Sequence, residues 1–68
     1  MKYQILLAVN TATQEEVSIV AQFATLESAK SFFRYWAVNA PEYDVENDSK
    51  ACWDFDTVTV TASIEPIS

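Results

Sequence analysis

Acidic and apolar side chains alternate in the segment from Glu42 to Asp56, and this pattern restricts the segment to extended structure. The segment holds six of the ten acidic residues and one of the four basic ones, so it accounts for −5 of a net charge of −6. Successive side chains of a strand point to opposite faces, so the carboxylates would share one face and the rings of Trp53 and Phe55 the other. The six acidic residues are Glu42, Asp44, Glu46, Asp48, Asp54 and Asp56.

The crowding of like charges in this segment has two explanations. Neighbouring carboxylates repel each other, so a face of this kind favours a function such as binding a basic partner. The alternative is a solvated edge whose charges keep other strands away. If 43–47 pairs with 51–55 in a hairpin, Asp44 lies opposite Asp54, and each carboxylate raises the pKa of the other.

Two segments near the N-terminus show the same period of two. Residues 2–9 are rich in β-branched and aliphatic side chains, and residues 16–24 alternate between apolar and polar ones. Two such segments joined by a short connection predict an antiparallel hairpin, with a loop rather than a tight turn because the connection lacks glycine. The apolar side chains expected to face inward from the second strand are Val17, Ile19, Ala21 and Phe23.

A helix is predicted from Leu26 to Asn39. Thr25 is a typical N-cap residue, and Glu27 places a negative charge in the first turn, where the helix dipole favours it. Pro41 ends the helix because it lacks an N–H and restricts the residue before it. The apolar stripe expected to face the sheet comprises Leu26, Ala29, Phe33 and either Trp36 or Ala37.

Residues 57–64 predict a final strand, and the whole chain, 1–68, is expected to form a single α+β domain. The simplest topology is ββαβ, with the last strand antiparallel beside the first, sheet order 2-1-3 and the helix on one face. A further acidic hairpin within 42–56 is compatible with this topology. The expected core comprises Ile5, Leu7, Val17, Ile19, Phe23, Leu26, Phe33, Val58 and Val60.

A conflict of parity arises between the acidic segment and the final strand. Trp53 and Phe55 are odd-numbered, whereas Val58 and Val60 are even-numbered, so one regular strand would place rings and valines on opposite faces. A β-bulge near residues 56–57 would realign them. The other interpretation is that both rings are exposed beside the acids, and the two interpretations remain open.

Several kinds of chemistry are excluded by composition. The chain has no histidine, the usual general base and metal ligand, and no glycine, which phosphate-binding loops require. Asp44, Glu46 and Asp48 resemble the start of a calcium loop, but Ser49 and Phe55 stand where that loop needs Gly and Glu. We therefore expect no catalytic residue, no enzymatic activity, no metal and no cofactor.

Charge and cysteine content restrict partners and compartment. With four basic residues and a pI near 4.1, direct binding to nucleic acid or to an anionic membrane is not expected. The apolar run of residues 5–9 is too short for a signal peptide or a membrane span. Cys52 has no internal partner for a disulfide, which favours a reducing cytoplasm.

The hairpin of residues 2–24, the junction Phe23–Ala29, the amphipathic helix and the final strand resemble small acidic inhibitors that bacteriophages direct against host machinery, such as anti-CRISPR proteins and inhibitors of host RNA polymerase. This resemblance implies a non-catalytic inhibitor, in the host cytoplasm if phage-encoded, that occupies the basic groove of a nucleic-acid-binding protein. The six acids would bind the partner.

The helix carries four large aromatic residues within five positions, and these span more than one face. Phe32 or Tyr35 is therefore expected to point away from the sheet, where an exposed ring can anchor a protein interface. A second hypothesis follows, in which the chain is a structural or assembly module that dimerises through an edge strand or exposed aromatics. The chain is thus expected to be a monomer or a homodimer.

Overall fold

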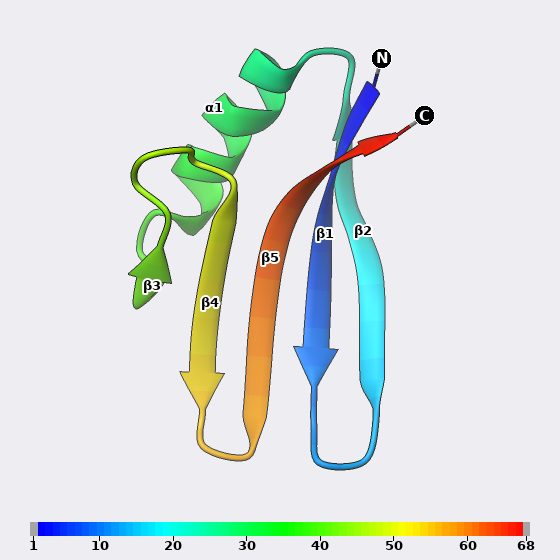
Figure 1. The fold of residues 1–68 in the computed structure, drawn as a ribbon, viewed down its shortest axis with the longest axis vertical. Coiled ribbons are helices and arrows are strands. Elements are labelled where there is room, and N and C mark those ends of the chain that lie inside the picture. Colours follow the sequence, from blue (N-terminus) through cyan, green and yellow to red (C-terminus); the bar gives the residue numbers. More distant parts are fainter. Residues whose placement is uncertain (1, 68) are drawn as a thin grey trace.

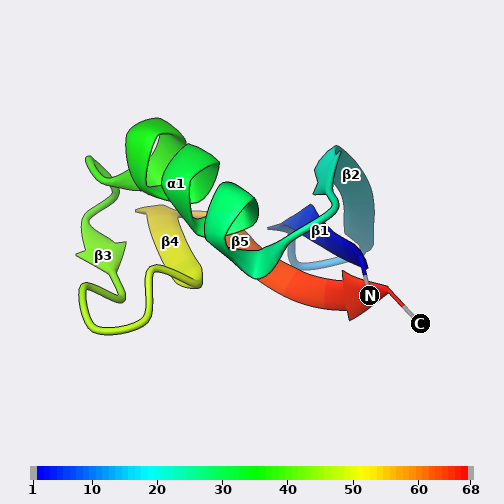
Figure 2. The same cartoon turned by 90° about the horizontal axis from the view of Figure 1, so that it is seen from above.

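Five antiparallel strands and one helix make up residues 2–67, the part of the chain that the computed structural model describes. The strands form one sheet in the order β2-β1-β5-β4-β3, and the helix lies on one face of it (Figures 1 and 2). The elements are β1 (Lys2–Asn10), β2 (Glu15–Phe23), α1 (Leu26–Ala37), β3 (Glu42–Tyr43), β4 (Lys50–Phe55) and β5 (Val58–Ile67).

The predicted ββαβ topology with sheet order 2-1-3 is wrong, although the broad α+β class fits. The last strand, β5, lies antiparallel beside β1 as expected, but β4 and β3 continue the sheet beyond it. Residues 50–55 have the alternation of a strand, and they pair with β5 because the chain reverses between them. The fold is therefore richer in strand than the prediction.

A two-residue turn at Asp56 and Thr57 resolves the conflict of parity. Trp53 lies opposite Val60, and Phe55 lies opposite Val58, so rings and valines share a face without a bulge. The bulge interpretation is wrong, and the interpretation that both rings are exposed holds for Phe55 but not for Trp53. Trp53 is half-buried against the core, whereas Phe55 is exposed.

A bulge occurs instead in the first hairpin. Ile5 lies opposite Ala21 but Leu6 lies opposite Ile19, so Val20 is the extra residue of β2. One extra residue moves every following side chain to the other face. The predicted inward orientation of Val17 and Ile19 is therefore wrong: both point away from the helix, with 55% and 57% of their surface exposed.

Local signals account for the ends of α1. The Oγ1 of Thr25 accepts a hydrogen bond from the backbone N–H of Ser28 at 3.2 Å, which confirms the predicted N-cap. The helix ends at Ala37, two residues before the predicted end, where the Val38 N–H still donates to the Arg34 carbonyl at 3.1 Å. The ends of this helix were thus set by residues close in sequence.

The core lies between α1 and the nearer half of the sheet. Its two largest fully buried side chains are Phe33 and Ile5. Small side chains surround them and allow the helix to approach the sheet closely. Beyond the helix the strands extend uncovered (Figure 1), so Val58 and Val60 are only half-buried, contrary to the predicted core. Leu26, the first residue of α1, is 38% exposed, which also differs from that prediction. The buried small residues are Ala29, Ala37, Ala40, Ala51 and Ala62.

Candidate functional site

Asp44 organises the loop of residues 44–49, which connects β3 to β4. Its carboxylate accepts hydrogen bonds from the backbone N–H groups of Glu46 and Asn47, each at 3.2 Å. The side chains of Asn47 and Ser49 donate two more, at 3.2 and 3.4 Å. These donors, the Asn47 N–H first, hold the pKa of Asp44 below its ordinary value of 3.8. Asp44 therefore holds the loop in place rather than projecting toward a partner.

Asp48 connects the same loop to the helix. Its carboxylate accepts a hydrogen bond from the Arg34 guanidinium at 2.6 Å and another from the Tyr43 hydroxyl at 2.8 Å. Its side chain is only 14% exposed, whereas that of Arg34 is 66% exposed. The hydrogen bond from Arg34, followed by that from Tyr43, lowers the pKa of Asp48. Asp48 has a positive φ of 52°, a backbone conformation that aspartate tolerates better than most residues.

Tyr43 links this polar group to the core. Its ring stacks on Phe33, with centroids 6.0 Å apart. Burial, together with the hydrogen bond to Asp48, raises the pKa of Tyr43 to about 12, so the phenol remains protonated and donates. Neither Arg34 nor Tyr43 was singled out by the sequence. Arg34 and Tyr43 each contact Asp48, from which they are 14 and 5 positions away in the sequence, and no local sequence pattern indicates these contacts.

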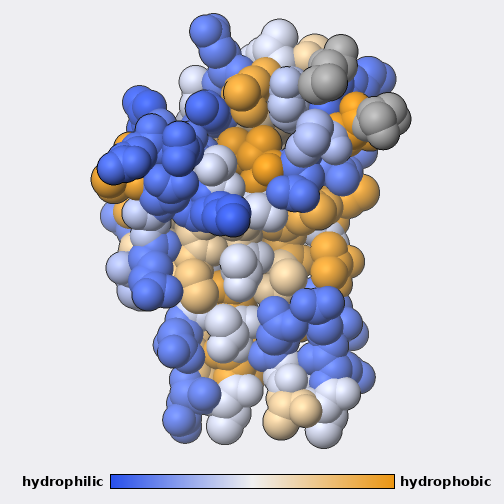
Figure 3. Space-filling model, in the orientation of Figure 1, coloured by the Kyte–Doolittle hydropathy of each residue, from blue (hydrophilic) through white to orange (hydrophobic). Residues whose placement is uncertain are grey.

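The other four acids are exposed along the β3–β4 side of the molecule. We call this set, Glu42, Glu46, Asp54 and Asp56, the acidic edge. Glu42 and Asp54 lie on the sheet face away from the helix, Glu46 lies in the loop, and Asp56 lies in the β4–β5 turn. Figure 3 shows hydrophilic side chains gathered along this side, from the loop to the turn.

The predicted row of six carboxylates on one face does not form. Glu42 lies opposite Cys52 and Tyr43 opposite Ala51, so the predicted pairing of 43–47 with 51–55 is wrong, and Asp44 is not opposite Asp54. The reason is that Asp44 accepts hydrogen bonds from the residues after it, which bends the chain and ends β3 after two residues. The expected rise in the pKa of Asp44 is also wrong, because its pKa is lowered, as is that of Asp48.

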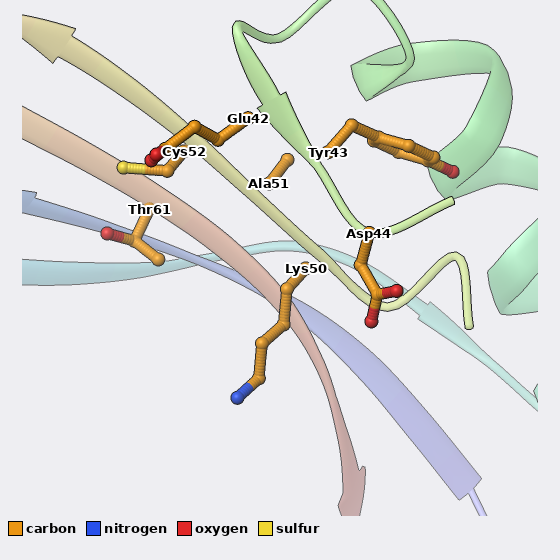
Figure 4. Close-up of a pocket in the computed structure, with 7 residues that line it drawn as sticks. All are labelled: Glu42, Tyr43, Asp44, Lys50, Ala51, Cys52 and Thr61. Carbon is orange, nitrogen blue, oxygen red and sulfur yellow. The ribbon is translucent and has the colours of Figure 1, made fainter. Parts of the chain in front are cut away.

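An open hollow of about 270 Å³ lies where β3 meets β4 (Figure 4). The side chains of Glu42, Cys52 and Thr61 point from three strands toward the sheet face that the helix does not cover. The hollow is shallow, and its walls hold one carboxylate of the acidic edge, that of Glu42. An exposed carboxylate of this kind can accept hydrogen bonds from a basic group.

The two predicted aromatic anchors differ in exposure. Tyr35 is 87% exposed, so its ring is available for contact with a partner. Phe32 is half-buried, with its ring centroid 5.4 Å from that of Phe23 and 6.3 Å from that of Trp36. Phe32 is therefore mainly a packing residue, and Tyr35 is the exposed ring.

Together these features define a small α+β domain whose β3–β4 side is acidic. Comparison with protein-family models, curated proteins and solved structures found no match. In residues 2–67, no three Asp, Glu, Cys or His side chains are grouped so that they could hold a metal ion. The one helix of that range lacks the length and hydrophobicity needed to cross a bilayer.

Proposed function

We propose that this chain is a non-catalytic protein-binding domain that inhibits a nucleic-acid-handling protein by covering its basic surface with the acidic edge. The observation that carries the proposal is that the acids of residues 42–56 fall into two groups, one bonded internally and one exposed. Asp44 and Asp48 are held by internal hydrogen bonds, whereas the four carboxylates of the acidic edge are exposed. The loop is folded by two acids, and the remaining four are free to meet a partner.

The charges near this edge are poorly neutralised. In the described part of the chain, the one ion pair joins Arg34 to Asp48, so the carboxylates of the acidic edge have no salt bridge. Unneutralised charges on one side create a local field that attracts a basic surface and speeds association. Exposed carboxylates gathered on one side also supply the negative charge that a basic nucleic-acid-binding surface attracts.

The resemblance to phage-encoded inhibitors supports the same target class. Such inhibitors act as stand-alone domains against host nucleic-acid machinery, and a chain of 68 residues with a net charge of −6 suits that mode of action. The partner would then be a host protein or complex in the cytoplasm, and bound nucleic acid would compete with this domain for it.

The test begins with affinity capture from a host extract, followed by purification of each captured nucleic-acid-binding protein. Binding of each to the parent domain is then measured by biolayer interferometry, with and without the duplex or RNA that the captured protein binds. We expect binding to weaken as salt rises and to be competed by nucleic acid. Binding that is insensitive to both would contradict the proposal.

A pair of charge-reversal variants tests the edge itself. Glu42→Lys/Asp54→Lys should reduce the association rate at least tenfold, because charge complementarity acts mainly on association. Glu15→Lys/Glu16→Lys is the matched control, since it changes the same charge on exposed residues of β2, which is three strands away from β4 in the sheet. Equal losses from both pairs would show that net charge, and not the acidic edge, governs binding.

A second candidate function is an assembly module. It is favoured by one observation, the apolar side chains exposed on the sheet face that α1 leaves uncovered.

A further inference from the structure

The sheet face opposite α1 carries an apolar cluster that the acidic edge does not use. Cross-strand pairing places Ile19 beside Leu6 and Val17 beside Ala8, on the face away from the helix. We call Leu6, Ala8, Val17 and Ile19 the apolar quartet. Figures 1 and 3 look onto this face, since α1 lies behind the sheet in that view, and apolar or weakly polar side chains occupy its middle.

This cluster is unusual for a sheet face in water. Antiparallel sheets covered on one side normally alternate apolar-in and polar-out, so their free face is polar. Here the bulge at Val20 turns Val17 and Ile19 outward, and more than half of the surface of each residue is exposed. Bulges commonly serve to redirect side chains. The backbone conformation of β2 therefore determines the exposure of Val17 and Ile19.

The middle of the same face continues the cluster without charge. Ala8 lies opposite Thr61 and Leu6 opposite Ser63 on β5, which gives small side chains that do not obstruct close approach. Lys50 and Glu65 line a hollow of about 360 Å³ together with Leu6, Ala8 and Val17 of the apolar quartet. The hollow therefore has one charge of each sign.

We infer that the chain forms a homodimer in which two sheets pack face to face through the apolar quartet, with both helices outside. A second copy suits this face in charge, because a twofold axis can bring Lys50 of one copy toward Glu65 of the other.

The dimer would also provide a second layer for a thin domain. Among residues 2–67 only Phe33 and Ile5 are large and fully buried, a small core for a chain near the lower limit of independent folding. Sheet-on-sheet packing would bury the apolar quartet as the inner layer of a sandwich. The quartet lies on β1 and β2, whereas Glu42 and Asp54 lie on β3 and β4 of the same sheet face, so different variants test this inference and the proposed function.

Sedimentation equilibrium over a wide range of protein concentration tests the inference. The parent should reach twice the chain mass of 7.7 kDa, and its melting temperature should rise with concentration. Val17→Glu/Ile19→Glu should halve the measured mass without loss of the circular dichroism of the fold, because both residues are exposed in a single copy.

The matched control is Val38→Glu/Val45→Glu, which adds the same charge at exposed valines outside this face, 49% and 78% exposed. The control should remain dimeric. A parent that is monomeric at every concentration overturns the inference. A dimer that persists in Val17→Glu/Ile19→Glu also overturns it and would indicate pairing at the open edge of β2. Equal dissociation of both variants overturns it as well and would indicate simple charge repulsion.

Discussion

Replacing Phe33 with alanine should remove most of the stability of this domain. Phe33 is fully buried between α1 and the sheet, and its ring centroid lies 6.1 Å from that of Trp36 and 6.0 Å from that of Tyr43. Truncation of a buried Phe to Ala costs about 3–5 kcal/mol, because contacts are lost and a cavity remains. The ring contacts and the small alanines around it leave little that could move in to fill that cavity.

This cost is comparable with the total stability of the chain. At about 0.05–0.15 kcal/mol per residue, a domain of 68 residues has a free energy of unfolding of roughly 3–10 kcal/mol. Urea unfolding at one fixed protein concentration, followed by the fluorescence of Trp36 and Trp53 and by far-UV circular dichroism, measures the loss. We expect Phe33→Ala to have a much lower midpoint or no folded baseline.

Tyr35→Ala is the control for this change. Tyr35 occupies the same helix but is 87% exposed, so its removal should alter the free energy of unfolding by no more than about 0.5 kcal/mol. Phe33→Leu should give an intermediate loss and keeps the experiment informative if the alanine variant does not fold. A Phe33→Ala variant that unfolds within about 1 kcal/mol of the parent would refute the packing of α1 on the sheet.

The remaining predictions concern the loop and the turn. Folding lowers the pKa values of Asp44 and Asp48 below 3.8, so the stability that these two carboxylates contribute is present above that pH and is lost as the pH falls through their folded pKa values. Their contribution to the melting temperature should therefore change little between about pH 7 and about pH 5. Below about pH 3.8 the melting temperature should fall. Asp48→Asn should lower the melting temperature at neutral pH, and its difference from the parent should shrink in acid; a constant difference would contradict the ionic role. Asp56 has a positive φ of 58° at the first position of a two-residue hairpin turn, so Asp56→Gly should stabilise by up to about 1 kcal/mol and Asp56→Val should destabilise, as thermal melts would show.

Several elements follow from short-range information alone. The hydroxyl of Thr25 reaches Ser28 only three residues away, and the apolar period of the following residues is that of a helix, so the start of α1 was predicted correctly. The first hairpin was also predicted, since two alternating segments separated by a short polar connection have few other ways to pair. In each case the stabilising partner is close in sequence.

Long-range contacts decided the rest. The bulge at Val20 shifts the register between Ile5 and Leu6, and the sequence of β2 gives no sign of it, because its regular alternation predicts one face inward along the whole strand. The pairing of β4 with β5 depends on a chain reversal at Asp56. The odd and even positions of Trp53 and Val60 fit such a reversal and a bulge equally well, so the sequence did not distinguish the two.

The candidate site also depends partly on local sequence and partly on long-range contacts. The charge and exposure of the acidic edge can be anticipated from composition, since a segment with a net charge of −5 must expose most of its carboxylates. The sequence alone therefore determined that this chain carries an acidic surface and a helix on a hairpin. Only the tertiary structure decided which acids are available, because Asp48 is held by Arg34, a residue 14 positions away that only the packing of α1 against the sheet brings within 2.6 Å.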